Sequence, residues 1–163
     1  TGHLVLSTLH TMDAKETIGR IIGMFPGSEQ NRIKMSLASV LQGVIAQRLV
    51  RTVENGRTAA VEILVKNARI EALILEGREG EIPDAIKEGK DVYKTQTFDQ
   101  ALLGLYAEGR ISREAAIQTS SSRNDITMAL DFYDADKSLK IARKEELPEG
   151  MKEYDKDIIG LKQ

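Results

Sequence analysis

The pair Asn55-Gly56 lies between two apolar runs and constrains the fold more than any other feature of the sequence. Both residues tolerate a positive φ, which a tight hairpin turn requires. The runs on either side, 44–50 and 58–65, have the length of strands. Alternate residues of the second run face opposite sides, with Val61, Ile63 and Val65 on one side and Ala60, Glu62 and Leu64 on the other. The sequence therefore predicts an antiparallel strand pair.

Helical patterns precede this hairpin. We expect Asp13 to cap a helix that ends at Pro26-Gly27. A second helix is expected to start at Ser28 or Glu29 and to end before Gly43. The apolar residues of both segments recur in steps of three and four, which places them on one face of each helix. These apolar residues are Ala14, Ile18, Ile21, Ile22 and Phe25 in the first segment, and Ile33, Leu37 and Val40 in the second.

Short capped helices are predicted after the hairpin. Two apolar stripes end at glycines, with Ile70, Leu73 and Ile74 before Gly77, and Ile82 and Ile86 before Gly89. Thr97 and Gln100 form a capping box, which opens a helix that Gly109 stops. Ser112 should cap a helix over 113–118, and Asn124 should cap one more through Ile126, Met128, Ala129 and Phe132. Residues 137–163 mix charges of both signs and are interpreted as a tail, with a weak helix or strand as an alternative.

The first residues of the sequence carry the most informative chemistry. The nearly continuous apolar run at 3–8 predicts a strand buried on both faces, as in a parallel sheet. We interpret Thr1 as a cut point inside a longer polypeptide. Ser7, Thr8, His10 and Thr11 follow the run, and ligands of open α/β sheets bind at the carboxyl ends of parallel strands. Such side chains can bond a phosphate or an attacking water, whereas the simpler interpretation is a strand end with ordinary polar residues.

Composition excludes several classes of site. The sequence has no cysteine, so disulfides and thiolate metal sites are impossible. Only two histidines are present, His3 and His10, which argues against a histidine-rich metal site, and we predict no metal site. The net charge is -2, so no basic field indicates nucleic acid. No apolar run reaches the roughly 20 residues that span a bilayer.

The string TGHLVLSTLHT at 1–11 resembles the histidine box of the secretion-superfamily motor ATPases. Asp13-Ala14, a helix and Phe25-Pro26 follow it, as in that superfamily. The segments GVIAQRLVR (43–51) and GRTAAVEIL (56–64) resemble the strand and hairpin partner that come next. Within the superfamily, TQTFDQALLGLYAEGRIS (95–112) is similar to the C-terminal helical region of PilT-like type IV pilus retraction ATPases, the motors of twitching motility. The resemblance covers roughly 1–130.

The resemblance implies an α/β fold with three parts. Residues 1–66 would form the back part of a RecA-like P-loop NTPase core without its P-loop. Residues 67–133 would form a small C-terminal helical domain, and 134–163 a charged tail. The complete protein would be a homo-hexamer that hydrolyses ATP with Mg²⁺. It would be cytoplasmic, peripheral to the inner membrane, where it would act on the pilus machinery.

The resemblance also assigns site residues. His10 matches the catalytic histidine that lies near the terminal phosphate and couples hydrolysis to movement. His3 matches the other histidine of the box, whose role is more structural. Thr8 and Thr11 match neighbouring box positions that sense the nucleotide. In a ring motor, Arg48 and Arg51 could face nucleotide or a neighbouring subunit, with surface solvation as the alternative.

Two features depart from the pattern of the retraction motors. The sequence contains no GxxxxGK[ST] loop, and its Gly89-Lys90 pair is followed by Asp91. The catalytic acid of these motors lies upstream of the box and is absent too. This chain alone is therefore expected to be inactive and to hold no ATP or Mg²⁺ tightly. The helical signature AIRNLIRE aligns with 69–76, where Ile70, Leu73, Ile74 and Glu76 match but Glu71, Ala72 and Leu75 replace Arg, Asn and Arg.

Two alternatives remain at this point. A related pilus-assembly or type II secretion motor would push subunits outward, but such relatives commonly carry a four-cysteine zinc motif in this region. A non-enzymatic interaction module would bind a partner through the helical part. Glu62 lies in an apolar strand and needs a partner, for which a structural ion pair is the expectation. The stripe from Phe98 to Tyr106 is expected to be core.

Overall fold

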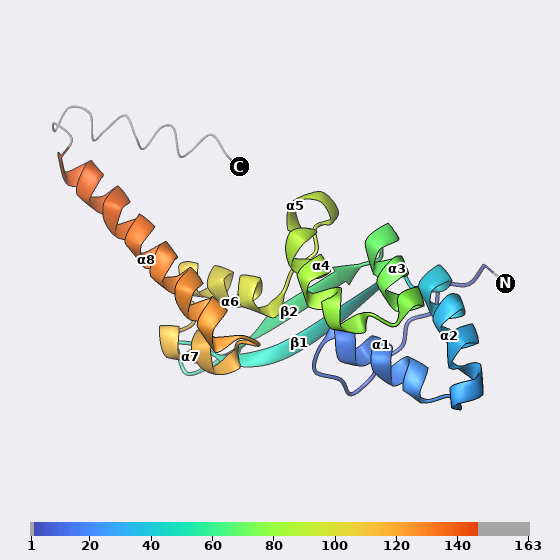
Figure 1. The fold of residues 1–163 in the computed structure, drawn as a ribbon. Coiled ribbons are helices and arrows are strands. Elements are labelled where there is room, and N and C mark those ends of the chain that lie inside the picture. Colours follow the sequence, from blue (N-terminus) through green and yellow to red (C-terminus); the bar gives the residue numbers. More distant parts are fainter. Residues whose placement is uncertain (1, 147–163) are drawn as a thin grey trace.

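The computed structural model describes residues 2–146, with side chains through 139 (Figure 1). In the described residues, two helices precede one pair of strands and the other helices follow it, and this α/β arrangement agrees with the predicted class. The elements are α1 (Ala14–Gly23), α2 (Gly27–Val40), β1 (Gly43–Arg51), β2 (Arg57–Val65), α3 (Ala68–Glu76), the 3-10 helix η1 (Glu79–Glu81), α4 (Ile82–Glu88), α5 (Lys90–Tyr93), α6 (Phe98–Ala107), α7 (Arg113–Thr119) and α8 (Arg123–Glu146).

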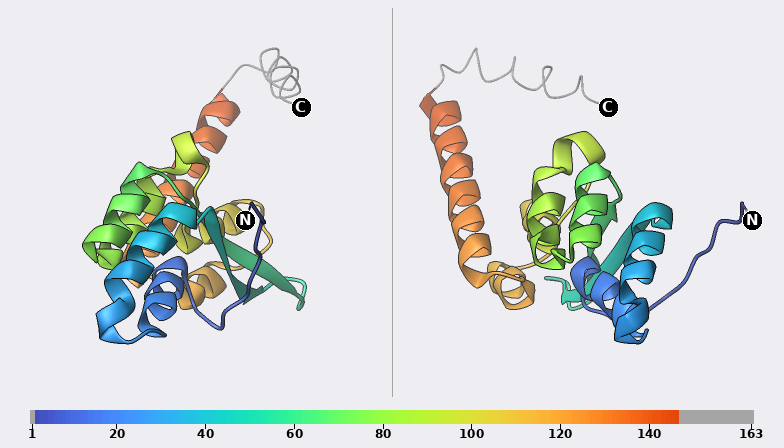
Figure 2. Two further views of the ribbon diagram at one scale, coloured as in Figure 1. Left: turned by 90° about the vertical axis from the view of Figure 1, so that its right-hand side faces the viewer. Right: turned by 45° about the vertical axis from the view of Figure 1, so that its right-hand side comes forward.

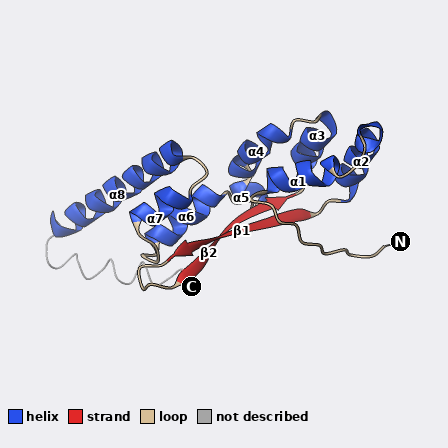
Figure 3. Cartoon of the chain, turned by 90° about the horizontal axis from the view of Figure 1, so that it is seen from below, coloured by secondary structure: helices blue, strands red, loops and turns tan. Residues whose placement is uncertain are grey.

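The predicted hairpin is confirmed. β1 pairs with β2 antiparallel, in a register that runs from Gly43 opposite Val65 to Arg51 opposite Arg57. Asn55 takes a φ of 60° in the turn. The helices lie along one side of this hairpin (Figure 3), and β2 buries Thr58, Ala60, Glu62 and Leu64 on that side. The other side exposes apolar residues of β1, since Ile45 is 77% and Leu49 64% exposed.

Two hydrophobic clusters form along the buried side of the hairpin. The first joins α1, α2, α3, α4 and the end of β2, and contains Ile18, Leu64, Ile70, Ile74, Ile82 and Ile86. The second joins the middle of the hairpin to α6, α7 and α8, and contains Val50, Ala60, Phe98, Leu102, Ile126 and Leu130. Each cluster contains residues from before and after position 66, the predicted domain boundary. Both cores therefore pack against the same side of the hairpin.

Most helix ends follow the sequence. Asp13, Asn67, Thr97 and Ser112 each cap a helix by accepting a hydrogen bond from the backbone N–H three residues on. Both halves of the capping box at Thr97 and Gln100 are present. The C-terminal glycines Gly77 and Gly109 take positive φ values of 70° and 72°. These caps are local interactions, and this is why sequence spacing alone located them.

Helix α8 differs from its prediction. It begins at Arg123, and Ser122 Oγ accepts from the N–H of Asp125 at 3.4 Å, so Asn124 lies inside the first turn and is not the cap. Only part of the expected stripe is buried, because Ile126 and Leu130 pack inward while Met128 and Phe132 are exposed. The helix continues through 137–146, where a tail was expected, and the rest of that tail lies outside the described residues. Its first turns contact α6 and α7, and the remainder projects from the body (Figures 1 and 2).

The predicted strand at 3–8 is not formed. Residues 2–11 are an irregular segment, here called the box segment, and Leu4, Val5 and Leu6 are 79%, 79% and 88% exposed. A strand needs backbone partners from other segments. In the part of the chain that the structure describes, β1 and β2 pair with each other, and Gln96 bridges to β2 at Ile63. The box segment therefore has no sheet to join and exposes the side chains that it was expected to bury.

Candidate functional site

The box segment presents its polar residues outward. His3, Thr8 and His10 are exposed, and Thr11 is half-buried where the segment reaches α1. The structure therefore brings Thr11 into contact with the fold but leaves the two histidines and Thr8 at the surface. The predicted site residues lie along one extended stretch that ends at the N-terminus of α1. They do not converge on a cavity among the described residues.

The end of the box segment is fixed tightly to α1. Thr17 Oγ1 donates to the carbonyl oxygen of Asp13 at 2.8 Å, so Thr11 Oγ1 donates to Thr17 Oγ1 at 2.7 Å. The Met12 N–H donates to Glu16 Oε2 at 2.8 Å, and the Glu16 N–H donates to Asp13 Oδ1 at 2.8 Å. These bonds satisfy orphan N–H groups at the start of the helix. The bond from Met12, together with the neighbouring Arg20 guanidinium, lowers the pKa of the Glu16 carboxyl.

Glu62 connects this helix start to the hairpin. Its side chain is only 6% exposed, and Oε1 accepts from the Ala14 N–H at 2.8 Å. Burial raises the pKa of the Glu62 carboxyl above its ordinary value. The bond from Ala14 opposes this rise, as does the charge of Arg48, whereas the charges of Asp13 and Asp99 add to it. Glu62 thus holds the residue after Asp13 at a fixed place on β2.

The partner of Glu62 differs from the expected ion pair. The carboxylate meets a helix N-terminus, whose free N–H groups and partial positive charge take the place of a cationic side chain. Glu62 also lines a cavity of ≈ 290 Å³ together with Phe98 and Asp99. Sequence spacing could show that Glu62 faces the apolar side of β2. It could not show which helix would arrive opposite that side, because the contact joins residues 48 positions apart.

The two arginines of β1 have different surroundings. Arg48 places its guanidinium 4.0 Å from the centre of the Phe98 ring. Its Nη1 donates to the Thr119 carbonyl oxygen and to Ser121 Oγ, both at 3.1 Å, while its Nε is buried and has no partner among the described residues. Arg48 therefore ties β1 to α6 and α7. Arg51 is exposed at the end of β1, where it remains accessible to another molecule.

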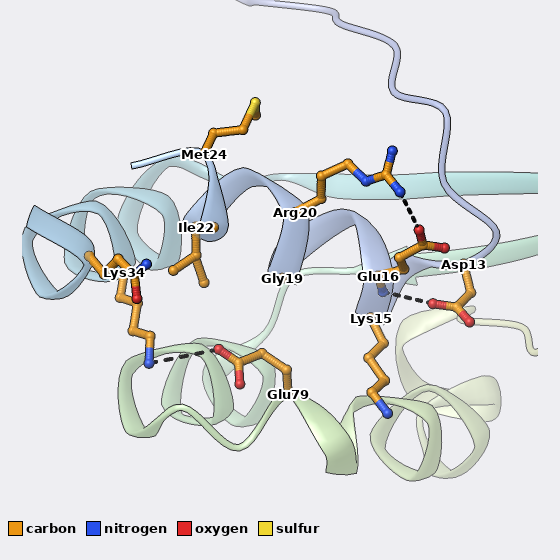
Figure 4. Close-up of a pocket in the computed structure, with 11 residues that line it drawn as sticks. Asp13, Lys15, Glu16, Gly19, Arg20, Ile22, Met24, Lys34 and Glu79 are labelled. Carbon is orange, nitrogen blue, oxygen red and sulfur yellow. Dashed lines mark hydrogen bonds and ion pairs between the residues drawn. The ribbon is translucent and has the colours of Figure 1, made fainter. Parts of the chain in front are cut away.

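An open hollow of ≈ 840 Å³ lies beside α1, bounded by α2 and η1 (Figure 4). Its cations face carboxylates, since Arg20 pairs with Glu16 at 2.7 Å and Lys34 Nζ lies 3.9 Å from Glu79. Lys15 extends across the hollow, away from Glu16 (Figure 4). The lining carries Lys15, Arg20 and Lys34 against Asp13, Glu16 and Glu79, so the charges balance.

The hollow beside α1 offers no excess of positive charge to a polyphosphate. A polyphosphate needs a net positive cradle or a free helix N-terminus. The hollow has no charge excess, and the start of α1 is already occupied by the carboxylates of Asp13 and Glu62. Within residues 2–139, no group of three or more His, Asp or Glu side chains is arranged to hold a metal ion. The candidate site is therefore the outward-facing box segment anchored on α1. Over the same described range, no helix is both long and apolar enough to cross a bilayer.

Comparison with known proteins identifies relatives of this chain. The family model of the Type II/IV secretion system proteins matches residues 1–115. The type IV pilus retractation ATPase PilT of Pseudomonas aeruginosa is 42% identical over 116 residues, which are 71% of this chain and 33% of the relative. The twitching motility protein of Neisseria gonorrhoeae is 40% identical over 117 residues, 71% of this chain and 31% of the relative.

Solved structures show a similar arrangement. The crystal structure of the pilus retraction motor PilT with bound ADP superposes with a TM-score of 0.67 at 37% identity. The superposition covers 77% of this chain and 34% of that one. The chain thus spans about a third of the length of the relatives that it matches.

Proposed function

Since the chain belongs to the Type II/IV secretion system protein family, we propose that it forms the C-terminal portion of a motor ATPase that powers type IV pilus retraction. Its similarity to a retraction ATPase and to a twitching motility protein supports retraction. The complete motor is then a RecA-like ATPase that works as a homo-hexamer. It acts in the cytoplasm at the inner membrane, on the pilus machinery.

The exposed box segment is the observation that carries this proposal. Leu4, Val5 and Leu6 form a continuous apolar stretch that is 79–88% exposed, and such a stretch marks an interaction surface. In the complete motor, strands from the remaining two thirds of the protein cover these residues on both faces. The segment then becomes a central strand of the core sheet, and its carboxyl end carries Thr8, His10 and Thr11 to the nucleotide.

His10 is the residue that we assign to catalysis. It lies three residues before Asp13. The neighbouring Thr11 is hydrogen-bonded to Thr17, which in turn is hydrogen-bonded to the Asp13 carbonyl oxygen. The next residue, Ala14, is hydrogen-bonded to Glu62 on β2. Displacement of His10 by the nucleotide would therefore be transmitted to α1 and the hairpin. The rest of the motor supplies the groups that hold ATP and Mg²⁺. The exposed Arg51 is assigned to a nucleotide or subunit contact, and Arg48 positions β1 against α6 and α7.

The test is His10→Ala in the full-length motor, compared with His3→Ala. We expect His10→Ala to lower the steady-state rate of ATP hydrolysis at least about tenfold, which corresponds to roughly 1.4 kcal/mol of lost transition-state stabilisation. Light scattering after size exclusion should show the same assembly for both variants. Unchanged hydrolysis by an intact His10→Ala assembly would refute the assignment. The 163-residue chain itself should bind ATP only weakly in calorimetry with Mg²⁺, and micromolar affinity would contradict our placement of the nucleotide.

A further inference from the structure

The cavity of ≈ 290 Å³ that Glu62 lines is bounded by members of both hydrophobic clusters, and we call it the Glu62 cavity. Its most buried lining residues are Glu62, Ile86 and Phe98, which are 6%, 1% and 1% exposed. Leu103 on α6 and Ala129 on α8 are half-buried and also line it. The cavity therefore combines apolar walls with a deeply buried carboxylate, which is the usual composition of a small-molecule site.

The charges of the Glu62 cavity balance only among its exposed residues. Two exposed lining residues are acids and two are lysines, namely Asp84 and Asp125 against Lys15 and Lys87. The other lining carboxylates are buried or half-buried and belong to Asp13, Glu62 and Asp99. We call these three the inner carboxylates. No cation among the lining residues offsets their negative charge, so the interior of the cavity has an excess of negative charge.

Each inner carboxylate is held by a backbone N–H at one oxygen. Glu62 Oε1 accepts from Ala14 at 2.8 Å, Asp13 Oδ1 from Glu16 at 2.8 Å, and Asp99 Oδ1 from Ser121 at 3.0 Å. Over residues 2–139, none of the three forms an ion pair with a lysine, arginine or histidine. These bonds fix the positions of the carboxylates and leave their charges without a cationic partner.

Glu62 Oε2 is the atom best placed to receive a ligand. It has no hydrogen-bond partner in the part of the chain that the structure describes, and Glu62 lines the cavity. Arg48 is near enough to oppose the rise in the Glu62 pKa. Its guanidinium, however, packs on the Phe98 ring and donates to the Thr119 carbonyl oxygen. The second oxygen of this buried carboxylate is therefore available to a cation in the cavity.

We propose that the Glu62 cavity binds a small organic cation, a primary ammonium group on a short apolar body. The ammonium donates to Glu62 Oε2 in a charge-assisted hydrogen bond, and the charges of Asp13 and Asp99 attract it further. The apolar body lies against Phe98 and Leu103. A metal ion fits less well, because no group of three or more His, Asp or Glu side chains among the described residues is arranged to hold one. An anion would be repelled by the inner carboxylates.

Binding of benzylammonium to the 163-residue chain at pH 7, measured by titration calorimetry, tests this proposal. Benzylammonium should bind saturably at one site. Benzyl alcohol has a similar shape without the charge and should bind at least about tenfold more weakly. Glu62→Gln keeps an acceptor for the Ala14 N–H and removes the charge, so it should weaken benzylammonium binding at least about tenfold. Ala129→Leu keeps every charge but narrows the cavity and should also weaken binding.

Glu79→Gln is the matched control. It makes the same change in the open hollow beside α1, which Glu62 does not line, and should leave the affinity for benzylammonium unchanged. Circular dichroism should show that each variant keeps its helices. Amine titrations at two chain concentrations, with light scattering, distinguish a free amine from a lysine side chain of a second copy. For a free amine, the affinity should not depend on the chain concentration.

Four outcomes would overturn the proposal. Absence of saturable benzylammonium binding to the parent chain would mean that the cavity takes no such cation. Equal affinities for the parent chain and Glu62→Gln would place the bound amine outside the Glu62 cavity. A loss of affinity in Glu79→Gln would assign the amine to the hollow beside α1. An affinity that falls as the chain concentration rises, together with a larger species in light scattering, would assign the cavity to a lysine of a second copy.

Discussion

The box segment and helix α6 were both predicted as ordered apolar elements, and only α6 is formed in this chain. Leu102 on α6 is fully buried, whereas Leu6 in the box segment is 88% exposed. The difference lies in where each element finds its backbone partners. A helix satisfies its hydrogen bonds within its own residues, and a capping box completes α6. A strand depends on neighbours that can be hundreds of residues away. An apolar segment can therefore form a buried strand only where partner strands are present, whereas an apolar helix such as α6 needs none for its backbone hydrogen bonds.

The same substitution in the two regions should give the largest contrast. Leu102→Ala removes a fully buried side chain from the second cluster and should lower the free energy of unfolding by about 3–5 kcal/mol. Leu6→Ala should change it by less than about 0.5 kcal/mol, because the side chain is at the surface. Urea unfolding of both variants measures this difference. In the complete motor, Leu6→Ala should become costly, and equal small effects in both proteins would refute the buried strand that we propose there.

Helix α3 extends the contrast to neighbouring positions of one element. Ile70, Leu73 and Ile74 are buried as predicted, while Leu75 is 46% exposed. Leu73→Ala should cost about 2–4 kcal/mol. Glu71→Ala should cost less than about 0.5 kcal/mol, because it removes only a surface ion pair with Lys66 at 2.9 Å. Thermal melts of the two variants check this, and similar losses would mean that the inward face of α3 is wrongly assigned.

The sequence predicted those parts of the fold that depend on residues close to one another. The Asn55 turn, the caps at Thr97 and Ser112 and the inward stripe of α3 all follow from spacings of a few positions. The cap of α8 was missed by two residues, since Ser122 and Asn124 are both good caps and spacing does not separate them. The apolar pattern also did not reveal that Met128 and Phe132 would be exposed while Ile126 is buried.

The candidate site was predicted in its residues but not in its surroundings. His10 and Thr11 were singled out by type and position, but their anchoring through Thr17 and Glu62 was not foreseen. Glu62 was recognised as a carboxylate that needs a partner. Its partner is a helix N-terminus from a distant part of the chain, and that pairing is a property of the packing of α1 on β2. Arg48 likewise stacks on Phe98, which no local pattern indicates.

Glu62 tests how firmly the box segment is tied to the hairpin. Glu62→Ala leaves the buried Ala14 N–H without an acceptor and should cost about 1–3 kcal/mol. Glu62→Gln keeps an acceptor oxygen and removes the buried charge, so it should be neutral or stabilising at pH 7. Chemical unfolding at pH 7 measures both. A Gln variant as unstable as the Ala variant would show that the charge, and not only the hydrogen bond, holds α1 in place.

The pH dependence of the same position has a definite sign. Because burial raises the pKa of the Glu62 carboxyl in the folded state, the folded protein binds this proton more tightly than the unfolded chain. The contribution of Glu62 to stability is therefore full below its ordinary pKa of 4.5 and falls as the pH rises through the folded-state value. The advantage of Glu62→Gln over the parent chain should grow over the same interval. An advantage that shrinks with rising pH would mean that the Glu62 pKa is lowered instead.

The smallest expected effect belongs to His3. From the sequence, His3→Ala was expected to act mainly on stability, because the side chain would pack within a strand. In this chain His3 is exposed and the strand is not formed, so His3→Ala should shift the melting temperature no more than other surface changes, within about 0.5 kcal/mol. In the complete motor, where we propose that the box segment joins a sheet, the same change should lower the melting temperature measurably while hydrolysis per folded assembly stays the same. Differential scanning calorimetry on both proteins gives the comparison. If His3→Ala leaves the melting temperature of both proteins unchanged, the His3 side chain is not packed in either protein. The box segment would then be a surface loop in the complete motor as well, and the explanation of the missing strand by missing neighbours would fail.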